Sequence, residues 1–77
     1  MENNIHMTKQ CRLVLEYIQE FGSITAWEAM REIGVMRLAA RIFDLASKHG
    51  YSFERETVYD TNRRGEKVHY AKYRLAV

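Results

Sequence analysis

Apolar residues recur at helical spacing along the first part of the chain, beginning after Thr8 and pausing at Gly22. A threonine at this position accepts a hydrogen bond from the free amides of a first helical turn, and a glycine ends a helix by adopting a left-handed conformation. We therefore predict an amphipathic helix that runs to about Phe21. Its expected apolar side holds Cys11, Val14, Leu15, Ile18 and Phe21, and Leu13 and Tyr17 widen it.

A second helical segment follows a short extended link at Ser23-Ile24. Thr25 and Glu28 have the Thr-x-x-Glu spacing of a capping box, which opens a helix. Gly34 limits that helix to a few turns. Its apolar residues, Trp27, Met30 and Ile33, recur every three positions.

After a tight turn, residues 36–49 form a third periodic segment, which again ends at a glycine, Gly50. The helical spacing divides it into two faces. The expected inner face is Leu38, Ile42, Leu45 and Ala46, with Ala39 beside them. The expected outer face is Arg37, Ala40, Arg41, Asp44, Ser47 and Lys48.

Beyond Gly50 the period changes from helical to alternating. Tyr51, Phe53, Val58 and Tyr59 favour one strand, and Val68, Tyr70, Tyr73 and Leu75 favour another. The interval at 60–67 is rich in turn residues and contains Gly65, which supplies the positive φ of a tight hairpin. We predict a two-stranded antiparallel hairpin with one face on the helices, formed in the second strand by Ala71, Tyr73 and Leu75.

Three helices followed by a hairpin is the element order of a winged helix-turn-helix, a small α+β fold. An isolated hairpin is marginal in water, so it must lie against the helices. The short second helix and its glycine turn set the third helix at a steep angle to it. We expect residues 1–7 to be a flexible leader and residues 8–77 to be the domain.

Length, composition and charge narrow the function. A chain of 77 residues is one domain and has no room for a deep cleft between domains. Its apolar runs are too short to cross a bilayer, and its single cysteine fits a reducing cytoplasm. Residues 1–36 carry three basic and five acidic side chains, whereas residues 37–77 carry nine basic and five acidic ones. This asymmetry favours one positive face directed at an anionic partner, although an uneven but solvated surface charge would give the same count.

The segments around the predicted turn also carry a family resemblance. The stretches that carry it are 23–29, Gly34, 37–45, Gly50-Tyr51 and the late Tyr73-Arg74-Leu75. They resemble the small helix-turn-helix proteins of bacteriophages and other mobile elements. The resemblance implies a DNA-binding domain that acts as a regulator or as an accessory factor in recombination. Such domains also serve as inhibitors of host proteins. The chain departs from the family in its modest basic character and in having Asp44 among the arginines.

The third segment supplies the first candidates for DNA contact. Arg37, Arg41 and Lys48 share one stripe, and arginine matches the guanine O6 and N7 atoms in the major groove. Ala40 would meet a thymine methyl group or permit close approach. The alternative is an ordinary solvated face, on which Asp44 pairs with Arg41 and Lys48.

The hairpin turn supplies a second set of candidates: Asn62, Arg63, Arg64 and Lys67. A basic arm can enter a minor groove or lie along phosphates, although basic loops are also common as simple soluble turns.

No arrangement typical of an enzyme is evident in the sequence, and we expect no cofactor and no metal. The histidines His6, His49 and His69 lack the spacing of a shared metal site. Cys11, Trp27, Tyr51 and Tyr73 are interpreted as core residues.

Three kinds of partner are therefore open. The first is double-stranded DNA, the second is a host protein that the same fold would inhibit, and the third is a second copy bound through Leu13 and Tyr17.

Overall fold

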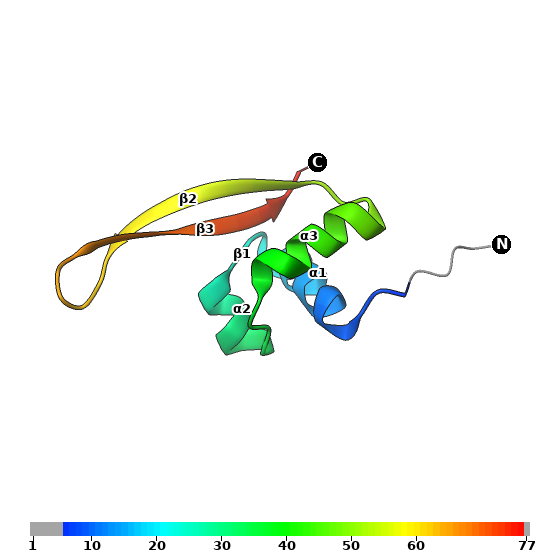
Figure 1. Ribbon diagram of the computed structural model, residues 1–77, viewed down its shortest axis with the longest axis horizontal. Helices are drawn as coiled ribbons and strands as arrows, with labels where there is room; N and C mark the ends of the chain where they lie inside the picture. The colour runs from blue at the N-terminus through cyan, green and yellow to red at the C-terminus, as the bar shows by residue number, and fades with distance from the viewer. Residues whose placement is uncertain (1–5, 77) are drawn as a thin grey trace.

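The computed structural model describes residues 6–76 and contains three helices and a three-stranded sheet (Figure 1). Residues 1–5 of the expected leader lie outside the described part, and Met7 packs against the core. In chain order the elements are α1 (Lys9–Phe21), β1 (Ile24–Thr25), α2 (Ala26–Ile33), α3 (Leu38–His49), β2 (Phe53–Thr61) and β3 (Lys67–Leu75).

The helix ends confirm the capping signals of the sequence. The Thr8 hydroxyl accepts a hydrogen bond from the Cys11 amide at 3.2 Å. Thr25 and Glu28 form the complete capping box: the Glu28 amide donates to the Thr25 hydroxyl at 3.2 Å, and the Thr25 amide donates to the Glu28 carboxylate at 2.9 Å. Gly34 ends α2 with φ 72°, a backbone conformation that is strained for any other residue. The turn into α3 therefore depends on this glycine.

The start of α3 lies later than the sequence predicted. The helix begins at Leu38, so Met36 belongs to the turn and Arg37 occupies the N-cap position. Arg37 makes no capping hydrogen bond through its side chain. That side chain is therefore not committed to the helix end.

The sheet corrects the prediction of a two-stranded hairpin. Ser23-Ile24 was expected to be only a link, but Ile24–Thr25 forms β1 and pairs antiparallel with β3, giving the strand order β1-β3-β2. The partners are Ile24 with Tyr73 and Thr25 with Lys72. Two residues show no alternation that a sequence pattern can reveal, so this strand exists only through its long-range pairing.

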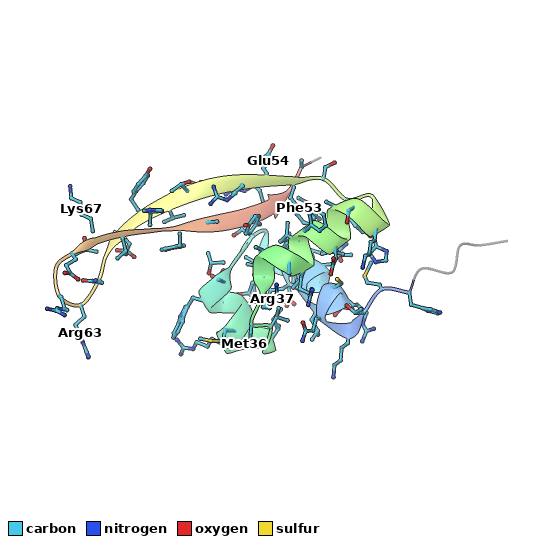
Figure 2. The ribbon with its side chains drawn as sticks, viewed as in Figure 1. Met36, Arg37, Phe53, Glu54, Arg63 and Lys67 are labelled. Atoms are coloured by element: carbon cyan, nitrogen blue, oxygen red, sulfur yellow. The ribbon has the colours of Figure 1, made fainter. Side chains whose placement is uncertain are left out.

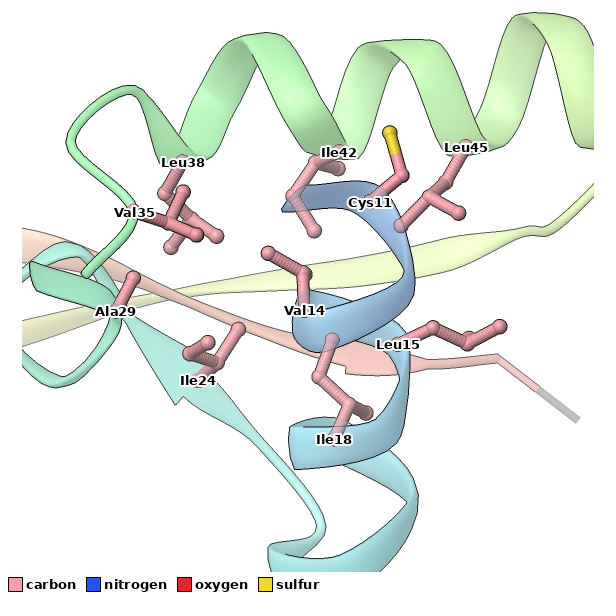
Figure 3. Packing of buried hydrophobic residues seen from close by; sticks show 10 residues of the cluster. All are labelled: Cys11, Val14, Leu15, Ile18, Ile24, Ala29, Val35, Leu38, Ile42 and Leu45. Carbon is pink, nitrogen blue, oxygen red and sulfur yellow. The ribbon is translucent and has the colours of Figure 1, made fainter. Parts of the chain in front are cut away.

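The core lies between α1, α3 and the base of the sheet (Figure 3). Figure 3 shows side chains of α3 pointing toward those of α1. Tyr51 and Tyr73 are half-buried against this core, as predicted. The buried apolar residues are Cys11, Val14, Leu15, Ile18, Ile24, Ala29, Val35, Leu38, Ile42 and Leu45.

Several apolar residues do not lie where the helical pattern placed them. Phe21 is 63% exposed and Trp27 is 60% exposed, so the assignment of both to the core is wrong. Ala39 and Ala46 are also exposed and are not on the inner face of α3. Val35, which the sequence left in a tight turn, is buried between the helices at 1% exposure. Small residues and residues at helix ends carry weak directional information, because the periodic pattern is defined by long apolar side chains within a helix.

The two long strands leave the helices as a ribbon, the wing, whose outer half has no helix beneath it (Figure 1). Strands β2 and β3 pair over nine residues each, from Phe53 with Leu75 to Thr61 with Lys67. Phe53 and Leu75 pack against the core, whereas every residue from Tyr59 to Tyr70 is exposed. The wing is thus anchored at its base and free at its tip.

This core predicts unequal effects for two neighbours on α3. Leu45→Ala should lower the free energy of unfolding by about 2–5 kcal/mol, because Leu45 is fully buried and its removal leaves a cavity. Phe43→Ala should change it by no more than about 0.5 kcal/mol, because that ring is solvated. Urea denaturation followed by far-ultraviolet circular dichroism measures both, and equal losses would contradict the packing described.

Candidate nucleic-acid interface

The exposed flank of α3 lies opposite the side chains that enter the core. Leu38, Ile42 and Leu45 point inward, which fixes the helix against α1. Arg37 is exposed at the N-terminal end of α3, and Figure 2 shows it beside the turn that carries Met36. Figure 2 also shows that this end of α3 lies on the side of the wing where α2 is found.

Arg41 differs from Arg37 in being held on both sides. Its guanidinium donates to the Gln10 side chain of α1 at 3.1 Å and pairs with Asp44 at 3.1 Å. The side chains of Arg41 and Asp44 are only 24% and 23% exposed. Lys48 reaches the same carboxylate at 3.9 Å and is mostly exposed. The pairing expected for a solvated face is therefore present, and it also connects α3 to the start of α1.

Two large apolar side chains of the α3 region are strongly exposed, and neither was predicted as a contact residue. Met36 is 71% exposed and Phe43 is 68% exposed. Ala39 is exposed between them, and Ala40 is half-buried. Phe43 belonged to neither predicted face. A helical wheel of α3 would have predicted that Phe43 is exposed, because position 43 lies on the side opposite to the inner residues.

The wing tip is a turn organised by Asn62. Its side-chain oxygen accepts hydrogen bonds from the backbone amides of Arg64 at 2.9 Å and Glu66 at 3.0 Å, and its amide group donates to the Glu66 carboxylate at 3.1 Å. Gly65 completes the turn with φ 82°. The Asn62 side chain is therefore occupied within the turn, whereas the side chains of Arg63, Arg64 and Lys67 are exposed.

The basic side chains of the tip do not all point the same way. In Figure 2 Arg63 extends toward the side of the wing on which α2 lies, and Lys67 extends toward the opposite side. Arg74, near the base, is paired with Glu56 on the neighbouring strand at 2.9 Å. Three exposed basic side chains therefore lie at the outer end of the wing, while Arg55 and Lys72 lie on its strands nearer the base.

A groove separates the wing from the N-terminal end of α2. Its two aromatic walls come from Trp27 and Tyr70, which are 60% and 41% exposed. Its charged lining residues are Lys72, Glu28 and Asp60, and Thr25 and Ala26 line it as well. Its charges are mixed, and so it extends the surface beside α2 without adding a strong positive field.

Leu13 and Tyr17 lie elsewhere, on the α1 side of the molecule. Both are half-buried and line a hollow that Glu16, Glu20 and Glu32 surround. Tyr17 also contacts Phe21, with ring centroids 4.6 Å apart. Burial, together with the nearby carboxylates of Glu28, Glu32 and Glu20, raises the pKa of the Tyr17 phenol above its usual value. This part of the surface is acidic, in contrast to the wing tip.

The histidine, cysteine and carboxylate side chains of residues 6–76 are of the kinds that bind metal ions. These residues hold no group of three or more histidine, cysteine, aspartate or glutamate side chains placed to bind a metal ion. Cys11 is a buried core residue, as predicted. None of the helices in this part of the chain is long and apolar enough to span a bilayer.

Comparison with known families identifies the class to which this architecture belongs. The sequence model that defines the winged helix-turn-helix domain family matches residues 9–77, which is nearly the whole chain. The chain belongs to this family, and the α+β fold predicted from the element order is confirmed with one additional strand. No curated protein and no solved structure matches the chain.

Proposed function

We propose that this protein binds double-stranded DNA, with α3 in the major groove and the wing tip on phosphates or in the minor groove. The observation that carries the proposal is that the chain exposes basic side chains on two separate elements, the start of α3 and the tip of the wing. Arg37 stands free at the N-terminal end of α3, the part of a recognition helix that meets base edges, and an arginine-bearing tip extends from the same body. Membership of the winged helix-turn-helix family supports this use of the fold.

The candidate residues divide into different roles within this proposal. Arg37 reads a base edge, with Ala40 allowing close approach. Arg63, Arg64 and Lys67 neutralise phosphates, and Asn62 shapes the turn that presents them. Lys48, near the C-terminal end of α3, contacts the phosphate backbone of the DNA. Arg41 contributes less directly, because Gln10 and Asp44 already hold its guanidinium.

The biological setting we propose is that of a bacteriophage or another mobile element in a bacterial cytoplasm. There the protein would regulate transcription or assist recombination, as the small helix-turn-helix proteins that it resembles do. A second candidate function is inhibition of a host protein through the same fold. The exposed Trp27 and the groove that it lines with Tyr70 favour this alternative, because exposed apolar groups are typical of protein interfaces.

The test of the DNA proposal is the salt dependence of duplex binding. If about five phosphates are neutralised, a plot of log K against log salt should have a slope of about −4.5. Electrophoretic retardation or fluorescence anisotropy of a labelled duplex, repeated at several salt concentrations, gives the slope. No binding to any duplex at low salt would reject DNA binding and favour the inhibitor, whereas binding with a flat titration would reject the proposed neutralisation of phosphates by the wing tip.

The division of roles predicts that two sets of arginine variants behave differently. Arg37→Ala should lose about 1–3 kcal/mol of binding free energy on a selected site and little on scrambled DNA. The double change Arg63→Ala and Arg64→Ala should weaken both duplexes alike, because phosphate contacts carry no sequence information. Arg12→Ala is the control, because Arg12 is an exposed arginine on α1 outside the proposed interface, and it should leave the affinity for both duplexes unchanged. Equal losses of Arg37→Ala on the two duplexes would make Arg37 a phosphate contact.

Self-association through Leu13 and Tyr17 is the remaining proposal for a partner. A symmetric contact there would bring two acidic rims together, so we expect the protein to be a monomer in the absence of DNA. If the dimer forms, we expect it only when two chains bind the same duplex. Sedimentation with and without a duplex that carries two sites measures the stoichiometry, and Tyr17→Glu is the variant that disrupts the patch. A Tyr17-dependent dimer free in solution would contradict this expectation.

A further inference from the structure

An apolar strip formed by Met36, Ala39 and Phe43 lies on the exposed side of the α3 region, and large apolar side chains are unusual on a surface that meets a polyanion. Met36 and Phe43 are 71% and 68% exposed, and the exposed Ala39 lies on the same flank. We propose that this flank reads the 5-methyl groups of thymines, so that the preferred duplex is rich in A·T pairs opposite the middle of α3. This inference rests on the proposed DNA binding and adds to it the chemical group that is recognised.

The polar groups of α3 are engaged in ways that leave few for reading bases. The Arg41 guanidinium is held by Gln10 and Asp44, and the Asp44 carboxylate is shared with Lys48. The Ser47 hydroxyl donates to the backbone carbonyl of Phe43 at 2.8 Å and is directed back to its own helix. Arg37 is the one arginine at the start of α3 that is left to match a guanine. The middle of α3 therefore offers few side-chain donors or acceptors that are available to hydrogen-bond with the edges of bases.

Apolar contact is the other means of reading a base pair in the major groove. Thymine alone among the four common bases carries a methyl group there, and alanine and phenylalanine side chains pack against it. Ala39 and the half-buried Ala40 leave room for the groove to approach the helix, and Phe43 supplies a large ring one turn further along. The flank thus offers one small and one large apolar surface at helical spacing.

The surroundings of the flank favour DNA over a protein as its occupant. Arg37 stands at one end of the helix and Lys48 near the other, so a basic side chain lies at each end of the apolar strip. The strip holds only one aromatic ring, Phe43, and a stable protein interface buries about 800 Å² on each partner. Continuity with the basic residues proposed to bind phosphate thus assigns the strip to the same duplex.

Removal of the thymine methyl from the DNA tests the inference without changing the protein. A preferred duplex is first selected from a randomised pool, and its thymines are then replaced by deoxyuridine, one position at a time. Each contacted thymine should lose about fourfold in affinity, the value expected for one buried methyl-sized group. Pairing and phosphates are unchanged by the replacement, so salt dependence should stay the same.

Protein variants show which side chain meets the methyl group. Phe43→Ala should bind the thymine duplex more weakly and should no longer distinguish thymine from deoxyuridine at one position. Phe21→Ala is the matched control, because Phe21 is 63% exposed on α1 and should retain full discrimination. Circular dichroism confirms that each variant is folded.

Two outcomes overturn the inference in distinguishable ways. A selected duplex that binds equally well with deoxyuridine at every position refutes methyl reading and leaves the proposed DNA binding intact. A failure to select any preferred duplex, together with the absence of salt-dependent binding, refutes both.

Discussion

The two residues of β1 hold the helical part and the wing together. Ile24 is fully buried in the core and pairs with Tyr73, while Thr25 pairs with Lys72 and caps α2 through its hydroxyl. One dipeptide therefore fills the core, extends the sheet and begins a helix. Because these roles fall on adjacent residues, the direction of α2 and the attachment of the wing are set by the same short segment. A shift of one residue in its pairing with β3 would turn Ile24 out of the core.

The packing of α3 follows from this arrangement and leaves it only one free flank. Leu38, Ile42 and Leu45 enter the core, and Arg41 is joined to Gln10 at the start of α1. Core packing on one side and the hydrogen bond to Gln10 on another therefore restrict the rotation of α3 about its own axis. A rigid helix is a more precise platform for recognition than a loop, since its exposed side chains keep their relative positions.

The features that could be predicted from the sequence are local ones. The caps at Thr8 and Thr25, the helix ends at Gly22 and Gly34, and the turn at Gly65 depend on residues within six positions of one another, so short-range rules describe them. The element order followed from these signals, and it was enough to indicate the fold. The long-range pairing of β1 was not accessible in this way.

The candidate site was predicted less completely than the fold. Arg37 and the wing tip were identified by residue type, but their exposure depends on tertiary packing. Trp27 was misplaced in the core, and Phe43 was overlooked, because a sequence gives the spacing of apolar residues and does not state which of them find partners. The role of Gln10 in holding Arg41 needs two helices to meet, and no sequence signal marks it.

The length of the wing has a consequence for how much DNA one chain would cover. Nine-residue strands extend about 30 Å. One turn of duplex rises about 34 Å over some ten base pairs, so the wing alone spans most of a turn. On the proposed ligand, one chain would therefore have a reach comparable to a full turn of duplex, although its helical part is small.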